Sequence, residues 1–173
     1  MDEALQPLIE MNSLIWEGFK RSLAELTADE IEWRPLPQAN NINLIVRHLR
    51  IEAEWHVDSL ERGAPMPRAE VTPQVQHSID SVGMDFNRNL KGLEDFYTRF
   101  DAQLRKMTPD ALKKQSALAY YASPRNLPAY MLGFHQAVHL AGHVAQISTI
   151  RNLYRKTRGE PARFVPVNPT YPK

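Results

Sequence analysis

Three of the six histidines in this chain stand four residues apart, in the stretch HQAVHLAGH. His135, His139 and His143 would lie along one face of a helix, because residues four apart are neighbours on a helical surface. The apolar stripe of the same segment, with Leu132 and Ile147, turns that face inward. Buried neutral imidazoles are costly unless their nitrogens have partners, and a transition metal is the most economical partner. The spacing therefore predicts that two of these histidines, four residues apart, bind one divalent transition metal ion.

A third metal ligand must come from another helix, because two histidines of one helix are too few for tight binding. His48 is the best candidate, since it lies on the apolar side of a second predicted helix. A lone inward histidine is more often a core residue whose nitrogens are hydrogen-bonded, and that alternative stays open for His48.

Two polar residues are candidates for supporting or catalytic roles beside these ligands. Gln146, one turn beyond His143, could hydrogen-bond the free ring nitrogen of a ligand or a bound water. Glu52, one turn beyond His48, could do the same for His48 or act as a base, although a solvated helix carboxylate is an equal alternative.

The remaining histidines are expected to play lesser parts. His135 should line the pocket, since a role as fourth ligand would be geometrically strained. His56 is interpreted as a partly buried or exposed helix residue, and His77 as a surface residue at a helix start.

Four long helical patterns, separated by proline-marked breaks, must position these residues, and no alternating pattern is long enough to build a sheet. The helices are predicted over residues 3–25, from Asn40 or Asn41 to about Arg62, over 76–106, and from about Asn126 to Thr157. The prediction is an all-α fold, most simply an up-down four-helix bundle with long loops over residues 1–158. A proline-rich C-terminal tail, residues 159–173, cannot be helical.

Several local signals support these boundaries. Asn40 or Asn41 is a natural N-cap for the second helix, and Thr108 could cap a short turn that runs through Leu112. Trp33 and Arg34, in a proline-containing loop, are expected to brace the helices rather than touch a substrate.

Composition excludes several classes of protein. The chain has 173 residues with a net charge of +1, so it carries no electrostatic footprint for nucleic acid or an anionic membrane. It has no cysteine, so a thiolate metal site is excluded and any thiol chemistry would need a small-molecule thiol. The N-terminus lacks the features of a secretory signal, and no apolar run reaches the roughly 18 residues of a membrane span. We expect a cytoplasmic protein.

Two motifs, in this order, resemble the DinB/YfiT-like superfamily. The stretch HQAVHLAGHVAQI is similar to the last helix of that family, whose histidine pair and following glutamine match His139, His143 and Gln146. The stretch LTADEIEWRPLPQANNINLIVRHLRIEAEW is similar to its first loop and second helix, and the metal histidine of that helix matches His48. The resemblance spans residues 5 to about 157.

The resemblance implies a four-helix bundle that holds one metal ion, usually zinc or nickel and in other cases iron or manganese, through three histidines. It also implies a small-molecule substrate and a homodimer. Family members of known activity largely transfer low-molecular-weight thiols to small electrophiles.

Three neutral ligands would leave the ion with its full charge and an open position, which suits either a thiol or a water. The leading expectation is therefore a metal-dependent thiol transferase. The alternatives are a metal-dependent hydrolase that uses an activated water, and a non-catalytic bundle that binds a metal or a ligand.

Overall fold

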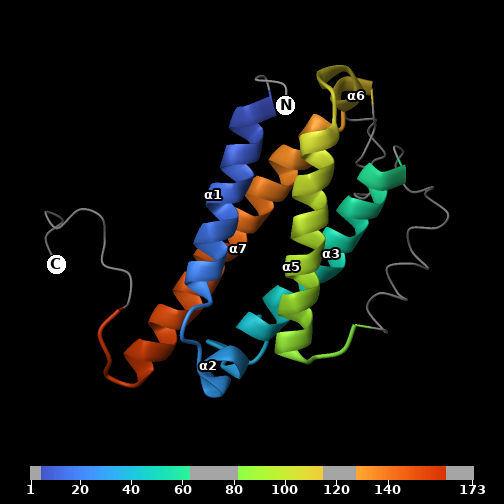
Figure 1. Cartoon of the computed structure of the whole chain (residues 1–173). Helices are drawn as coiled ribbons and strands as arrows, with labels where there is room; N and C mark the ends of the chain where they lie inside the picture. The colour runs from blue at the N-terminus through green and yellow to red at the C-terminus, as the bar shows by residue number, and fades with distance from the viewer. Residues whose placement is uncertain (1–4, 63–81, 115–127, 163–173) are drawn as a thin grey trace, which may run out of the picture.

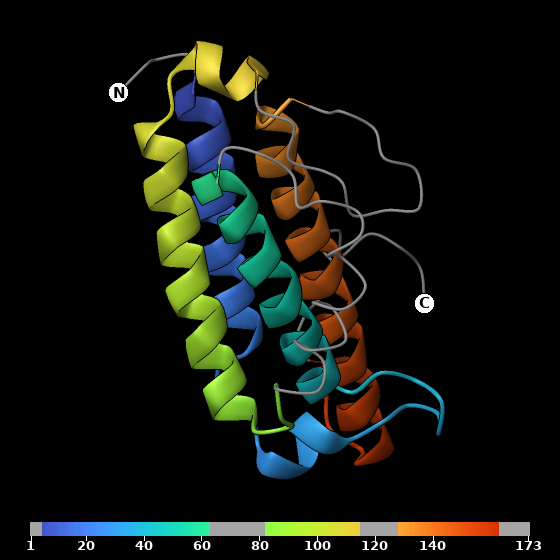
Figure 2. The ribbon, with the colours of Figure 1, turned by 90° about the vertical axis from the view of Figure 1, so that its right-hand side faces the viewer.

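The described part of the chain is mostly helical. A computed structural model describes residues 5–62, 82–114 and 128–162, and no strand occurs among them. Four long helices lie side by side in Figures 1 and 2. They are α1 (Gln6–Ser22), α3 (Ile42–Arg62), α5 (Phe86–Lys106) and α7 (Tyr130–Thr157), and the short α2 (Ala28–Glu32) and α6 (Pro109–Lys114) lie at opposite ends. No described helix combines the length and the apolar character needed to cross a membrane.

The four long helices do not alternate in direction. Helix α1 packs along α7, and α3 packs along α5, and both pairs run parallel (Figures 1 and 2). Helices α3 and α7 also contact each other and run in opposite directions, which matters for the candidate site. The simple up-down order expected from the sequence is therefore wrong, because α3 and α5 run the same way.

Side-chain caps explain where three of the helices begin. Thr27 Oγ1 accepts a hydrogen bond from the Glu30 amide at α2, and Asp85 Oδ1 accepts one from the Arg88 amide at α5. Asn41 Oδ1 accepts a bond of 2.8 Å from the Leu44 amide, so of the two asparagines named above it is Asn41 that caps α3. Each bond satisfies an amide that has no partner within its helix.

The structure corrects several predicted boundaries. Helix α2 lies where a loop was expected. Helix α5 begins only at Phe86, because residues 82–85 are not helical, and α7 begins at Tyr130, so Pro128 precedes it. The short helix at Pro109–Lys114 is confirmed, with Thr108 Oγ1 accepting from the Ala111 amide. Most of the proline-rich tail and His77 lie outside the described residues.

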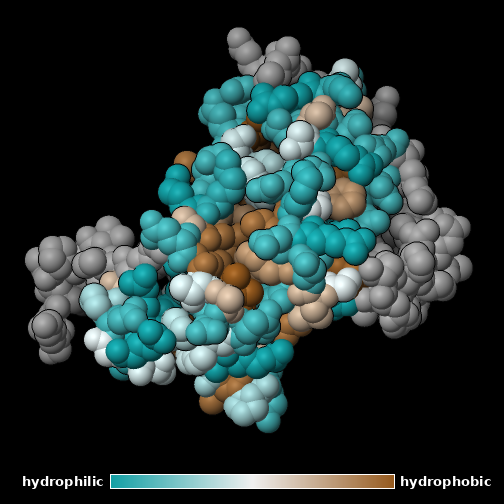
Figure 3. Space-filling view, turned by 60° about the horizontal axis from the view of Figure 1, so that its bottom comes forward, coloured by the Kyte–Doolittle hydropathy of each residue, from teal (hydrophilic) through white to brown (hydrophobic). Residues whose placement is uncertain are grey.

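Buried apolar side chains from all four long helices form two core clusters. One includes Trp16, Phe19, Leu49, Tyr97 and Ile147, and the other lies toward α6 with Ile9, Val57, Phe100, Leu112 and Leu132. The face in Figure 3 is mostly hydrophilic, with hydrophobic side chains gathered near its middle. The core thus fixes the long helices against one another while leaving polar residues to fill the space between α3 and α7.

A buried ion pair fastens α7 to the helices at one end of the molecule. Arg151 is 0% exposed; its Nε donates to Oε1 of Glu30 at 2.7 Å, and its Nη1 donates to the carbonyl of Ser22 at 2.6 Å. The pair links α7, α2 and the last residue of α1. A buried charge that loses its partner keeps its desolvation cost, so this contact is sensitive to single substitutions.

We expect Arg151→Met to lower the free energy of unfolding by about 3–5 kcal/mol, because it leaves the Glu30 carboxylate buried without its partner. The double variant Arg151→Met/Glu30→Leu should be more stable than the single variant, since no charge is then stranded. Urea unfolding followed by circular dichroism measures both. Lys156→Met, an exposed residue of the same helix, is the control and should change stability by about 0.5 kcal/mol or less. Equal losses in the single variant and the control would contradict this account.

Candidate metal centre

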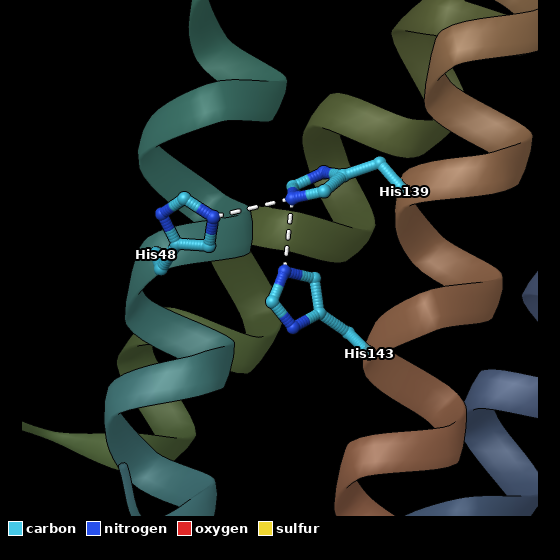
Figure 4. Close-up of side chains that lie close together, drawn as sticks. All are labelled: His48, His139 and His143. Atoms are coloured by element: carbon cyan, nitrogen blue, oxygen red, sulfur yellow. Dashed lines mark hydrogen bonds between the residues drawn. The ribbon is translucent and has the colours of Figure 1, made fainter. Parts of the chain in front are cut away.

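Three histidines of α3 and α7 meet through the same ring atom. His48 extends from α3, and His139 and His143 extend from α7 (Figure 4). The Nε2 atom of His139 lies 2.9 Å from Nε2 of His143 and 3.2 Å from Nε2 of His48. The three rings therefore converge on one point from two helices, and this group could hold a metal ion.

The opposite ring nitrogens of His139 and His143 face hydrogen-bond acceptors. His139 Nδ1 lies 2.8 Å from Oε2 of Glu52, and His143 Nδ1 lies 2.9 Å from Oε1 of Gln146. A carboxylate or carbonyl oxygen beside Nδ1 requires that nitrogen to carry the proton. Each neutral ring then presents the lone pair of its Nε2 to the centre of the group, which is the form that binds metals.

This arrangement places lone pairs against one another. Two neutral rings whose Nδ1 atoms carry the protons direct the lone pairs of His139 and His143 together over 2.9 Å. Only a cation between them, a proton or a metal ion, converts that contact into an attraction. Nitrogens that bind one tetrahedral zinc ion lie about 3.3 Å apart, from Zn–N bonds of about 2.0–2.1 Å. The observed separations need only a few tenths of an ångström of expansion, so these residues fit a metal of that size.

Burial and neighbouring groups lower the pKa values of two of the three histidines, His143 and His48. Burial, together with the nearby His139 and His48, lowers the pKa of His143 to about 4, against a smaller opposite effect of Gln146 and Glu52. Burial also lowers the pKa of His48, although the Glu52 carboxylate opposes it. Protons are therefore weak competitors for these nitrogens near neutral pH.

Glu52 is a buried carboxylate in the middle of the cluster. Burial raises its pKa, but the hydrogen bond from His139 and the proximity of His139, His48 and His56 outweigh that effect and lower it to about 2. Its side chain is 3% exposed, so it is not the solvated helix carboxylate that was the alternative. Its main partner is His139, because His48 Nε2 is 3.8 Å from its other oxygen.

The centre opens to solvent on the α3 side. The side chain of His48 is 46% exposed, whereas that of His139 is 17% exposed. Its place on the apolar side of α3 had suggested that His48 faces inward. The structure instead places it at the rim of the site.

A second layer of polar residues continues from the centre between the two helices. The ring of His135 stacks on that of His139, with 5.5 Å between the ring centroids. It meets the ring of His56 edge-on, with 5.2 Å between the centroids. His56 is 5% exposed, and its Nδ1 lies 2.8 Å from Oε1 of Gln136. The expectation that His56 is partly buried or exposed is wrong, since it is fully buried in this cluster.

His135 also belongs to a second group with metal-binding side chains, together with Glu52 and His139. This group shares His139 with the first, and it would use Glu52 as a ligand instead of as the ion-pair partner of His139. The three Nε2 atoms form the ligand set that leaves the hydrogen bonds of Glu52 and Gln146 in place. His135 accordingly lines the site, as expected, and is not needed as a fourth ligand.

The residues expected to brace the helices do so. Trp33 packs against the core and meets the ring of Tyr154 edge-on at 5.7 Å. Arg34 Nη1 donates to the carbonyl of Ala39 at 2.9 Å and so closes the loop ahead of α3. Neither residue contacts the three histidines.

The burial of His56 in this cluster was not predicted, although the sequence contains a pattern that indicates it. His48, Glu52 and His56 repeat every four residues on α3, as His135, His139 and His143 do on α7. On antiparallel helices, each member of one repeat can lie opposite a member of the other.

Comparison with protein-family models, curated proteins and solved structures finds no match to this chain. The chemistry of the site therefore rests on its own residues.

The metal-free protein should lose stability as the pH falls from 6.5 toward 4. Burial lowers the pKa of His56 to about 4, whereas an unfolded chain gives the ordinary value of 6.5. The unfolded state therefore binds more protons in this window, and His56 alone should account for a loss of up to about 3 kcal/mol. The measurement is urea unfolding at several pH values, with His56→Gln as the comparison. If the free energy of unfolding of His56→Gln falls as steeply with pH as that of the wild type, His56 is not the source of the loss.

Proposed function

We propose that this chain is a DinB-like four-helix bundle that binds one divalent transition metal ion through Nε2 of His48, His139 and His143. The convergence of these three atoms within 3.2 Å of His139 Nε2 is the observation that carries the proposal. Imidazole suits zinc and nickel, and three protein ligands would leave a fourth coordination position open. Helices α1 and α7 run in one direction and α3 and α5 in the other. The three ligands come from the antiparallel pair α3 and α7.

We further propose that the protein transfers a low-molecular-weight thiol onto a small electrophile. An ion held by three neutral ligands would supply positive charge and an open position that favour the deprotonated form of a thiol or a water. The chain has no cysteine, so the thiol must be a second small molecule. In the transfer a sulfur–carbon bond forms, the leaving group departs with the bonding electrons, and the thiol proton passes to solvent.

The residues of this chain have positioning roles in the proposal. Glu52 holds the ring of His139 by its Nδ1, and Gln146 holds the ring of His143 in the same way. Because Glu52 is buried and engaged with His139, it is a positioning residue rather than the base that the sequence allowed. His48, the most exposed of the three, leaves the approach to the site open.

Metal binding should depend on both the ligands and their partners. We expect wild-type protein to bind about one zinc or nickel ion per chain, and His139→Ala to lose that ion. Glu52→Gln keeps all three histidines but weakens the hold on His139, so metal affinity should fall roughly 10- to 100-fold. Titration against a metal-binding dye measures the affinities.

Glu54→Gln is the matched control, since it makes the same substitution two residues away on α3. It should leave metal affinity unchanged. His139→Ala protein with wild-type metal content would contradict the ligand assignment, and equal affinities in Glu52→Gln and the control would contradict the role of Glu52.

Thiol transfer should require the metal. We expect zinc- or nickel-loaded protein to form thioether adducts from 1-chloro-2,4-dinitrobenzene and one thiol of a panel that includes glutathione, bacillithiol and mycothiol. Chelation should abolish the activity and added metal should restore it, as followed by absorbance. His139→Ala is the inactive control.

Two other outcomes would overturn this proposal. Metal-dependent cleavage of 4-nitrophenyl acetate without thiol, and no adduct with any thiol, would favour the hydrolase. A fall in melting temperature on metal removal without turnover in either assay would favour a non-catalytic bundle.

A further inference from the structure

A surface pocket of about 390 Å³ lies next to the candidate metal centre. Its walls come from the α2–α3 connection, from α3 and from α7, and Ile45, Gln146 and Thr149 are among its lining residues. Figure 2 shows the connection as a loop beside the neighbouring ends of α3 and α7. The volume lies within the range of small-molecule sites, roughly 300–1,000 Å³.

Gln146 belongs to both the pocket and the metal centre. Its Oε1 takes the hydrogen bond of His143 Nδ1, and the same side chain forms part of the pocket wall. A molecule in the pocket would therefore lie beside the ring of His143. The metal centre and the pocket thus share one residue, Gln146.

The loop that forms one wall is held in place by its own contacts. Arg34 fastens the carbonyl of Ala39, and Asn41 caps the helix that follows. Trp33, at the start of the connection, packs against the core. Because these contacts are made within the chain itself, they favour a wall that is formed before a ligand binds.

The pocket is uncharged and mostly apolar. Pro35, Ala39 and Ile45 contribute apolar surface, and no charged side chain is among the described residues that line it. Polar groups come from Asn40, Gln146 and Thr149. None of the described lining residues offers a positive charge that would offset even a partial loss of water by a carboxylate.

The hydrogen bonds already made define what a ligand should carry. Because Oε1 of Gln146 is taken by His143, the NH₂ group of that amide is the part left to bind a ligand, and it can only donate. The group that Gln146 can bind is therefore an acceptor, such as a carbonyl or nitro oxygen.

We propose that this pocket binds the apolar part of an uncharged small molecule that bears a hydrogen-bond acceptor, and that it excludes carboxylates. That this molecule is the electrophile acted on at the metal centre rests on the function proposed above. The selectivity of the pocket does not, because none of the three metal ligands lines it.

A pair of unreactive probes tests the selectivity. 1,3-Dinitrobenzene and 3,5-dinitrobenzoate share a ring and two nitro groups, and they differ by one carboxylate. We expect 1,3-dinitrobenzene to bind wild-type protein at least tenfold more tightly than 3,5-dinitrobenzoate, by ligand-observed NMR titration.

Two substitutions on α7 locate the binding. Thr149→Phe fills the pocket and should weaken 1,3-dinitrobenzene binding at least tenfold. Leu153→Phe, an exposed position one turn further along that does not line the pocket, should leave it unchanged. Circular dichroism melting confirms that both variants fold.

The outcomes separate this proposal from the proposed function. His139→Ala should lose the metal and keep 1,3-dinitrobenzene binding, so selective binding without thiol transfer would sink only the proposed activity. Equal or tighter binding of 3,5-dinitrobenzoate would overturn the pocket proposal. Binding that Thr149→Phe leaves unchanged would overturn it as well.

Discussion

The contact between Glu52 and His139 lies at the centre of this protein, and most of the site depends on it. A carboxylate that is 3% exposed needs a polar or charged partner, and the Nδ1 of His139 lies 2.8 Å from it across the α3–α7 interface. The same contact sets the ring of His139 so that its Nε2 meets those of His48 and His143. This buried polar pair thus offsets part of the cost of burying the Glu52 carboxylate. It also orients the Nε2 atom of His139 in the candidate metal site.

The antiparallel course of α3 and α7 makes this contact repeat. As residue numbers rise along α3 they fall along α7, so His48 lies near His143, Glu52 near His139, and His56 near His135. The Arg151–Glu30 pair and the apolar core hold the helices in this register. A shift of either helix by one turn would pair different members of the two repeats and disperse the three Nε2 atoms.

The sequence was informative where a local pattern carries the physics. Spacing of four placed His139 and His143 on one helix face, the Asn40–Asn41 pair marked the start of α3, and Thr108 marked the start of α6. It was less informative where the outcome depends on which helices meet. The partner of Glu52, the burial of His56 and the rim position of His48 follow from the register of α3 against α7, which no single-helix pattern contains.

X-ray absorption spectroscopy of zinc-loaded protein tests the central claim most directly, because it reports the atoms bound to the ion. The account predicts three imidazole nitrogens at about 2.0 Å, with the remaining position taken by a light atom from solvent. A zinc ion with one imidazole or none, or bound mainly through carboxylate oxygens, would contradict it.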